Sequence, residues 1–288
     1  MSPRLARTVF GTEFQNPVLL AAGTAGFGRE VAGVIDLEQL GGIVCKAVSP
    51  LPRAGNKAPR VAEFPFGMLN SIGLANPGLA TVQQEQLPWM VANLKRARLL
   101  VNVVGFEVED FADVVAGLDQ FDGITAFELN LSCPNTSAGG LEFGADPASV
   151  TSVISAARKR TRKALLAKLS PALPDIAGMA LVARDAGADG VTVVNTLPGY
   201  LAEGGTPRLG NGFGGVSGPA LLPVGVLATR RIMERSGGMT VIGVGGIRSA
   251  DDARQYLDAG ASLVAIGTAA LADPRLPERV VRGLGGRV

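Results

Sequence analysis

The 288-residue sequence predicts an α/β fold, a (β/α)8 TIM barrel with loop lobes over its C-terminal mouth. Eight short apolar runs have the composition of strands buried on both faces, and stretches of helical periodicity separate them. The length also fits, because a barrel of this kind needs roughly 250 residues. We therefore expect a single domain that spans residues 1–288.

The strand and helix candidates alternate along the whole chain. The strand candidates cover residues 18–22, 43–47, 99–104, 127–132, 165–169, 191–195, 241–244 and 263–266. The helix candidates cover residues 30–40, 79–97, 110–119, 147–162, 175–186, 219–236, 250–259 and 274–284. Asp146 and Ser249 stand at N-cap positions, and Gly187 and Gly260 stand where helix C-caps belong.

Two connections, residues 49–78 and 197–217, are too long for simple loops between a strand and a helix. They are rich in Gly, Pro, Asn and Arg and lack helical periodicity. We expect them to form lobes over the C-terminal mouth of the barrel, because the loops at that end carry function.

The composition excludes several classes of protein. With no histidine and two cysteines, a Ser-His-Asp or Cys-His device is impossible and no metal site is expected. The net charge of +2 gives no footprint for nucleic acid, and the basic group at residues 158–163 is interpreted as a solvated helix end. The N-terminus shows no signal pattern, and no apolar run approaches the roughly 18 residues that would indicate a membrane span. We expect a cytoplasmic protein with reduced thiols.

Cys133 lies at the end of the strand candidate 127–132, between Asn130 and Asn135. Catalytic groups of an α/β barrel lie at such strand ends. The following Pro134 and the nearby glycines show that the chain is entering a loop there. Cys45, inside an apolar run, fits a buried structural cysteine instead. Cys133 is therefore the candidate for proton transfer.

Glycines and lysines end several strand candidates. Gly245 and Gly246 follow the seventh, and Gly267 ends the eighth, where a barrel commonly binds phosphate with backbone N–H groups. Lys46 and Lys168 each end an apolar strand, where an ammonium needs an anionic partner. We expect a phosphorylated ligand, and an electron-rich ring or a carboxylate between the two lysines.

These residues belong to longer blocks that resemble class 1 dihydroorotate dehydrogenase. The blocks run in family order across nearly the whole chain: Lys46 ahead of residues 52–56, then residues 65–78, 128–135, 139–144, 194–196, 215–220, 243–247 and 267–269. The loop Gly-Gly-Leu-Glu-Phe-Gly at residues 139–144 is most similar to that of the class 1B catalytic subunit. The resemblance implies FMN-dependent oxidation of (S)-dihydroorotate to orotate in de novo pyrimidine (UMP) biosynthesis.

The resemblance also implies one FMN per chain, with its phosphate on the glycine-rich strand ends. Lys168 would face the N1/O2 edge of the flavin and stabilise its reduced form. The flavin-binding positions that it implies are Ala22, Lys46, Ala47, Asn102, Asn130, Lys168, Val194, Gly218, Gly245, Gly246, Gly267 and Thr268.

The substrate site that the resemblance implies lies beside the flavin. Cys133 would take a proton from C5 of dihydroorotate while hydride leaves C6, and a thiol of pKa near 8.5 is a serviceable base slightly above neutral pH. The substrate-binding positions that it implies are Lys46, Asn70, Ser71, Ile72, Gly73, Leu74, Asn130, Asn135, Asn195 and Thr196.

The class 1B resemblance implies partners as well. The chain would form a homodimer and join an electron-transfer subunit carrying FAD and a [2Fe–2S] cluster, which gives a heterotetramer that reduces NAD⁺. No Gly-x-Gly-x-x-Gly follows an early strand, so the chain is not expected to use NAD by itself.

Three alternatives stand beside this interpretation. A fumarate-dependent class 1A enzyme is disfavoured by the loop at residues 139–144, and an FMN-dependent tRNA dihydrouridine synthase is disfavoured by the near-neutral charge. A binding subunit that has lost its reaction would have no need of Cys133 and Lys168. Ala22 departs from the family, which often has Ser there, and residues 200–214 match only loosely.

Overall fold

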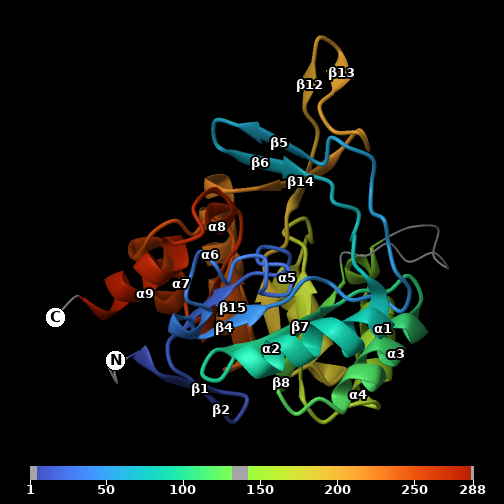
Figure 1. Cartoon of the computed structure of the whole chain (residues 1–288), viewed down its shortest axis with the longest axis vertical. Helices are drawn as coiled ribbons and strands as arrows, with labels where there is room; N and C mark the ends of the chain where they lie inside the picture. The colour runs from blue at the N-terminus through green and yellow to red at the C-terminus, as the bar shows by residue number, and fades with distance from the viewer. Residues whose placement is uncertain (1–4, 132–141, 287–288) are drawn as a thin grey trace.

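The computed structural model describes residues 5–131 and 142–286. Its centre is a closed barrel of parallel strands in chain order, which confirms the predicted (β/α)8 architecture (Figure 1). The barrel strands are β3 (Val18–Leu20), β4 (Gly42–Val44), β7 (Arg98–Val103), β8 (Ile124–Asn130), β9 (Ala164–Leu169), β10 (Gly190–Val193), β15 (Thr240–Val244) and β16 (Leu263–Ile266). Each overlaps one predicted run, because short apolar segments between helices form strands that are buried on both faces.

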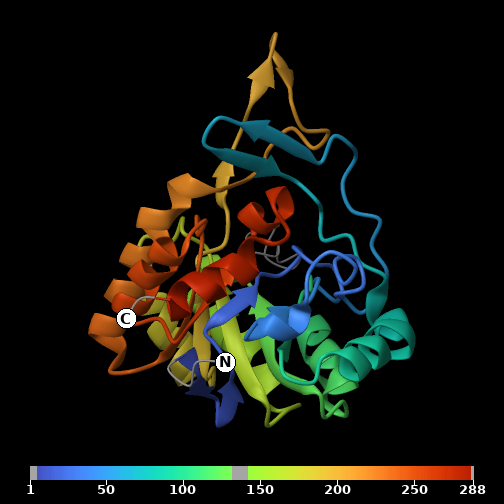
Figure 2. The same cartoon turned by 60° about the vertical axis from the view of Figure 1, so that its left-hand side comes forward.

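Helices cover the outside of the barrel (Figures 1 and 2). The helical segments are η2 (Leu37–Gln39), α1 (Gly78–Thr81), η3 (Val82–Gln86), α2 (Leu87–Asn93), α3 (Val108–Asp119), η5 (Phe143–Ala145), α4 (Pro147–Arg158), α5 (Ile176–Asp185), η6 (Pro219–Leu221), α6 (Leu222–Ser236), α7 (Ala250–Asp258), α8 (Thr268–Ala272) and α9 (Leu276–Gly285). In the described part of the chain, none of these helices is long and apolar enough to cross a membrane.

The predicted helix caps are confirmed. Asp146 accepts a hydrogen bond from the backbone N–H of Ser149 at 2.8 Å, and Ser249 caps α7 in the same way. Gly187 and Gly260 follow α5 and α7 with φ angles of +110° and +104°, a conformation that glycine adopts without steric cost.

Two helix predictions are wrong in part. Residues 30–40 form irregular turns and the short η2, because Gly33 interrupts the run and the Asp36 side chain accepts from the N–H of Glu38. The predicted helix 79–97 ends at Asn93 and contains the π-helical turn η3. Pro88 explains that turn, since proline has no N–H to donate to the carbonyl four residues earlier.

The other helix differences lie at the ends. α4 stops at Arg158 instead of residue 162, and the Arg158 guanidinium donates to the carbonyl of Thr161 at 3.0 Å and pairs with Asp189. α9 begins at Leu276 rather than at residue 274, and the short α8 before it was not predicted.

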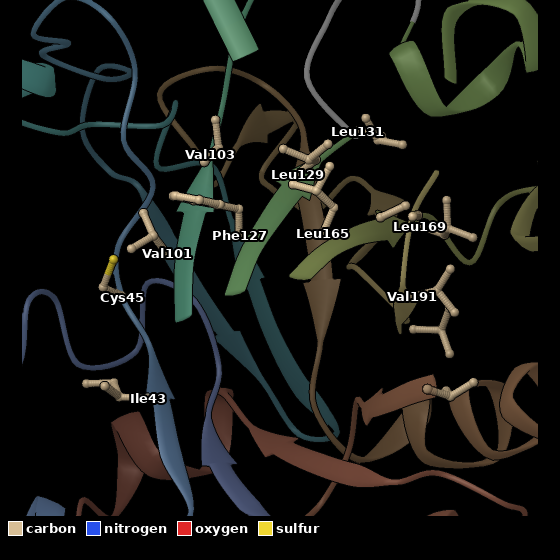
Figure 3. Close-up of a cluster of buried hydrophobic side chains, with 14 of the residues drawn as sticks. Ile43, Cys45, Val101, Val103, Phe127, Leu129, Leu131, Leu165, Leu169 and Val191 are labelled. Atoms are coloured by element: carbon tan, nitrogen blue, oxygen red, sulfur yellow. The ribbon is translucent and has the colours of Figure 1, made fainter. Parts of the chain in front are cut away.

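The alternation of strand side chains divides the core into two layers. Outward-facing residues such as Ile43, Cys45, Val101 and Phe127 join the large cluster between the strands and the helices (Figure 3). Inward-facing residues fill the barrel itself: Leu19, Ala21, Val44, Leu100, Ala126, Ala164, Leu166, Ile242, Val244, Leu263 and Ala265. The inner layer is therefore apolar over most of the barrel.

An N-terminal hairpin closes the bottom of the barrel. It consists of β1 (Arg7–Val9) and β2 (Thr12–Phe14), and it was not among the predicted elements. Val9 and Phe14 pack into the inner cluster, and Phe14 is fully buried. The opposite end of the barrel is the C-terminal mouth, toward which the parallel strands run (Figure 1).

The two long connections form one lobe above the mouth, which confirms the prediction of lobes and adds that they pair with each other (Figures 1 and 2). The first contributes β5 (Val61–Phe64) and β6 (Gly67–Asn70), and the second contributes β11 (Leu197–Gly199) and β14 (Gly214–Ser217), in the order β11-β14-β6-β5. A small hairpin of β12 (Ala202–Glu203) and β13 (Thr206–Pro207) projects from this sheet.

Phe14, the hairpin residue that plugs the bottom of the barrel, gives a stability prediction. Phe14→Ala removes a fully buried ring from the inner cluster and should lower the free energy of unfolding by about 3–5 kcal/mol in urea titrations. Glu13→Ala on the same strand is the control, because the Glu13 side chain is exposed and its backbone carbonyl, which binds Arg98, is retained. Equal effects of the two substitutions would contradict a role for Phe14 as the plug.

Candidate active site

Polar side chains line the barrel interior on the side formed by β7 to β10. Asn102, Glu128, Lys168 and Thr192 are all buried, and they contact one another across four adjacent strands. Side chains two residues apart on a strand point to the same face, and Asn102, Glu128 and Lys168 each follow an inward-facing apolar residue by two positions. Thr192 is in register with the inward-facing Ile242 and therefore also faces inward. These four polar residues therefore lie nearer to the C-terminal mouth than the apolar residues that fill the lower part of the barrel.

Glu128 is the centre of this group. Its carboxylate accepts hydrogen bonds from Asn102 Nδ2 and Thr192 Oγ1, each at 2.7 Å. The Lys168 Nζ lies 3.5 Å from Glu128 Oε1. Glu128 is 1% exposed and Lys168 is 8% exposed, so this is a buried ion pair. A protein carboxylate therefore provides the anionic partner that the sequence required for Lys168.

A second polar chain links the barrel mouth to the lobe. Asn195 Nδ2 donates to Asn130 Oδ1 at 3.2 Å, and Asn195 Oδ1 accepts from the N–H of Thr196. Thr196 in turn packs on Gly215, where a Cβ would lie 2.0 Å from the Thr196 hydroxyl. The carbonyl of Gly215 accepts from Asn70 Nδ2 at 3.1 Å. Four of the positions expected to bind substrate are thus connected.

The loop after β6 has a constrained backbone. Gly73 has φ +72° and Leu74 has φ +58°, which is an uncommon conformation for a residue with a side chain. Ser71 accepts a hydrogen bond from Asn56 Nδ2 at 2.7 Å, while Ile72 is exposed. The hydrogen bond from Asn56 thus ties this loop to an earlier part of the same connection, residues 49–78.

Two glycines after β15 form a tight turn beside Tyr256. Gly245 and Gly246 have φ angles of +125° and +74°. The buried Tyr256 hydroxyl donates to the Gly245 carbonyl at 2.8 Å. In a trans peptide the following N–H points the opposite way, so this bond directs the N–H of Gly246 away from Tyr256. A Cβ on Gly246 would lie 2.5 Å from the backbone nitrogen of Leu222.

The other strand-end positions lie nearby. The Thr268 hydroxyl donates to Ser217 Oγ at 2.7 Å, which joins the end of β16 to the residue before Gly218. Gly218 has φ +113°. Gly267, between β16 and α8, places its α-carbon against Ala21, because a Cβ there would lie 3.6 Å from the Ala21 Cβ.

The remaining predicted positions lie around the mouth. Lys46 is half-buried and its N–H donates to Gly26 O; among the described residues its ammonium has no acceptor within hydrogen-bond distance. Ala22 packs at the edge of the inner cluster and Ala47 at the edge of the outer one. Val194, which is buried, donates from its N–H to Val244 O. The structure thus brings these positions to one end of the barrel.

Of the two cysteines, the structure describes only Cys45. Cys45 is fully buried on the outer face of the barrel, and its burial raises the pKa of the thiol to about 12. It is therefore a structural cysteine, as predicted, and no base near neutral pH. Cys133 and Asn135 lie outside the described residues. Within the described residues no cluster of acidic or thiol groups could hold a metal ion.

Sequence reasoning missed Glu128 and Tyr256. The signal for Glu128 was present, because it is a charged residue in a strand buried on both faces and lies two positions before Asn130. Nothing in the sequence marks Tyr256, whose hydroxyl meets Gly245 only through the packing of α7 on β15.

Comparisons with known proteins identify the family. A family model described as dihydroorotate dehydrogenase matches residues 4–288. A relative from Solibacter usitatus, provisionally named dihydroorotate dehydrogenase A (fumarate), is 43% identical over 99% of this chain and 93% of its own length. The dihydroorotate dehydrogenase B (NAD(+)) catalytic subunit of Desulforudis audaxviator is 43% identical over 95% of this chain and 89% of its own.

A solved structure shares the fold. The dihydroorotate dehydrogenase of Eimeria tenella, in complex with ferulenol, superimposes with a TM-score of 0.83 over 98% of this chain and 84% of its own, at 25% identity. The family model spans the barrel, the lobe and every strand end described above, and this chain therefore belongs to the dihydroorotate dehydrogenase family.

Proposed function

We propose that this chain oxidises (S)-dihydroorotate to orotate with one FMN at the barrel mouth. The observation that carries the proposal is that three kinds of group meet at one end of the barrel: the buried Lys168, the amide chain from Asn130 to Asn70, and the glycine turn at Gly245 and Gly246. Members of this family are flavin enzymes, and the product orotate belongs to de novo pyrimidine synthesis.

The residues present fit FMN. The backbone of Gly245 and Gly246, together with that of Gly218, Gly267 and Thr268, would supply N–H groups for the phosphate. When bound there, FMN would supply the acceptor for the hydride that leaves C6 of dihydroorotate. The side chains and backbone expected around its ring are those of Ala22, Lys46, Ala47, Asn102, Asn130, Lys168 and Val194.

Each polar residue of the mouth has a role in this proposal. Lys168 would hold a fixed ammonium beside the flavin, where it would offset negative charge at no cost of reorganisation. Asn195 donates to Asn130 and accepts from the N–H of Thr196, and these bonds would hold the two side-chain amides toward the imide of the substrate, beside the Thr196 hydroxyl. The remaining substrate positions are Lys46, Asn70, Ser71, Ile72, Gly73, Leu74 and Asn135.

We further propose that NAD⁺ is the final acceptor, reached through a partner subunit with FAD and a [2Fe–2S] cluster, and that the catalytic chain is a homodimer within that heterotetramer. The loop at residues 139–144 and the relatives named NAD(+) catalytic subunits support this. The relative named for fumarate keeps the class 1A enzyme as the second candidate.

Cys133 is the proposed base. Cys133→Ala should leave FMN bound but slow anaerobic flavin reduction by dihydroorotate by roughly 10²-fold or more, as expected when a proton acceptor is lost. Cys45→Ala is the matched control, since its buried thiol faces away from the mouth, and it should be reduced at the wild-type rate. A Cys133 variant that matches the wild-type rate would refute the assignment.

Tyr256 is expected to set the phosphate-binding turn. Tyr256→Phe leaves the Gly245 carbonyl without its donor and should weaken FMN binding by about tenfold, the value of one hydrogen bond. Riboflavin, which has no phosphate, should bind the variant and the wild type equally in fluorescence titrations. Equal weakening of both ligands would show that Tyr256 acts through packing alone.

The acceptor can be assigned by assaying the isolated chain with dihydroorotate and NAD⁺, fumarate or an artificial dye. We expect turnover with the dye and none with NAD⁺, because no Gly-x-Gly-x-x-Gly follows an early strand of the sequence. Turnover with NAD⁺ by the chain alone would contradict the need for a partner. Rapid turnover with fumarate would identify a class 1A enzyme.

A further inference from the structure

Glu128 is a buried carboxylate for which the proposed reaction has no use. It lies inside a barrel whose other inward positions nearby include Leu100, Ala126 and Leu166. Burying an ion pair in such surroundings costs much of what the pair gains, so apolar residues of similar volume would stabilise the barrel as well. The stability of the fold therefore does not account for the pair.

The hydrogen bonds of Glu128 fix the carboxylate from two sides. Asn102 comes from β7 and Thr192 from β10, and both donate at 2.7 Å, one to each oxygen. Lys168 approaches the oxygen that Asn102 already occupies, at the longer distance of 3.5 Å. The neutral donors Asn102 and Thr192 fix the position of the Glu128 carboxylate. The fixed carboxylate attracts the Lys168 ammonium.

The strand register places Lys168 on the mouth side of Glu128. Glu128 is level with Leu166 on β9, and Lys168 is two residues further along, level with Asn130. Since the strands run toward the mouth, Lys168 lies nearer to it than Glu128 does. An ammonium carries three protons, and the contact at 3.5 Å uses at most one of them. The others are available for a ligand at the mouth.

We propose that Glu128 is a positioning residue that acts through Lys168. Its carboxylate, fixed by Asn102 and Thr192, holds the Lys168 ammonium in place beneath the mouth, where the ammonium would favour the reduced flavin over the oxidised one. The inference rests on the proposed flavin site. It assigns to Glu128, which is not among the positions expected to bind flavin or substrate, part of the control of the flavin's reduction potential.

The test measures the dissociation constants of oxidised and reduced FMN. Glu128→Gln keeps the shape and removes the charge, and it should lower the preference for reduced FMN by at least about tenfold, which for a two-electron couple is about 30 mV in potential. Lys168→Met should shift the preference in the same direction. In the Lys168→Met background, adding Glu128→Gln should no longer lower the preference, because the residue through which Glu128 acts is gone and the loss of a negative charge does not by itself disfavour the reduced flavin.

Thr192→Val is the matched control. It removes one hydrogen bond to the same carboxylate and keeps the charge beside Lys168, so the preference for reduced FMN should stay near that of the wild type. An effect as large as that of Glu128→Gln would show that the network, and not the charge, matters, and would overturn the proposal. Full additivity of the Glu128 and Lys168 substitutions would overturn it as well.

The failure of this inference can be told from the failure of the proposed function. A wild-type protein that binds no FMN would refute the flavin site itself. FMN that binds normally and is bleached by dihydroorotate, with a Glu128→Gln variant of unchanged potential, would refute the inference alone. Should the Gln variant not fold, Glu128→Asp draws the carboxylate back by one methylene and must lower the preference in the same direction, and an unchanged Asp variant overturns the proposal.

Discussion

A charge inside a closed barrel has to find its counter-charge within the barrel, and the arrangement of the mouth depends on this constraint. Glu128 on β8 and Lys168 on β9 are such a pair of opposite charges. Asn102 and Thr192 each donate a hydrogen bond to the Glu128 carboxylate. These four residues replace an apolar layer on one side of the barrel. Of the two charged residues in this layer, Lys168 lies nearer to the mouth.

The same end of the barrel is assembled from segments that are distant in the sequence. Asn70 reaches the carbonyl of Gly215, and Thr196 packs on the same glycine, so the lobe strands β6 and β14 are tied to the amide chain that ends at Asn130. Ser217 of β14 also accepts from Thr268. The lobe and the strand ends therefore form one continuous set of contacts, and a planar polar substrate between them would meet amides from both.

The relatives agree on the reaction class and differ in the electron acceptor that their names give. The family model matches the barrel and the lobe alike, so the architecture described here is common to the family. The names of the relatives thus give two different electron acceptors for one architecture.

The sequence by itself determined the barrel, its eight strands, the helix caps and the strand ends where function lies, because these depend on local periodicity and on single residues such as Asp146 and Gly260. It also marked Lys168 as a charge in need of a partner. Only the tertiary structure decided that the partner is Glu128, that Tyr256 orients the Gly245 peptide, and that the two long connections share one sheet. Those pairings join residues from different strands and lobes, and such contacts arise from the register and packing of the whole barrel, which no local pattern encodes.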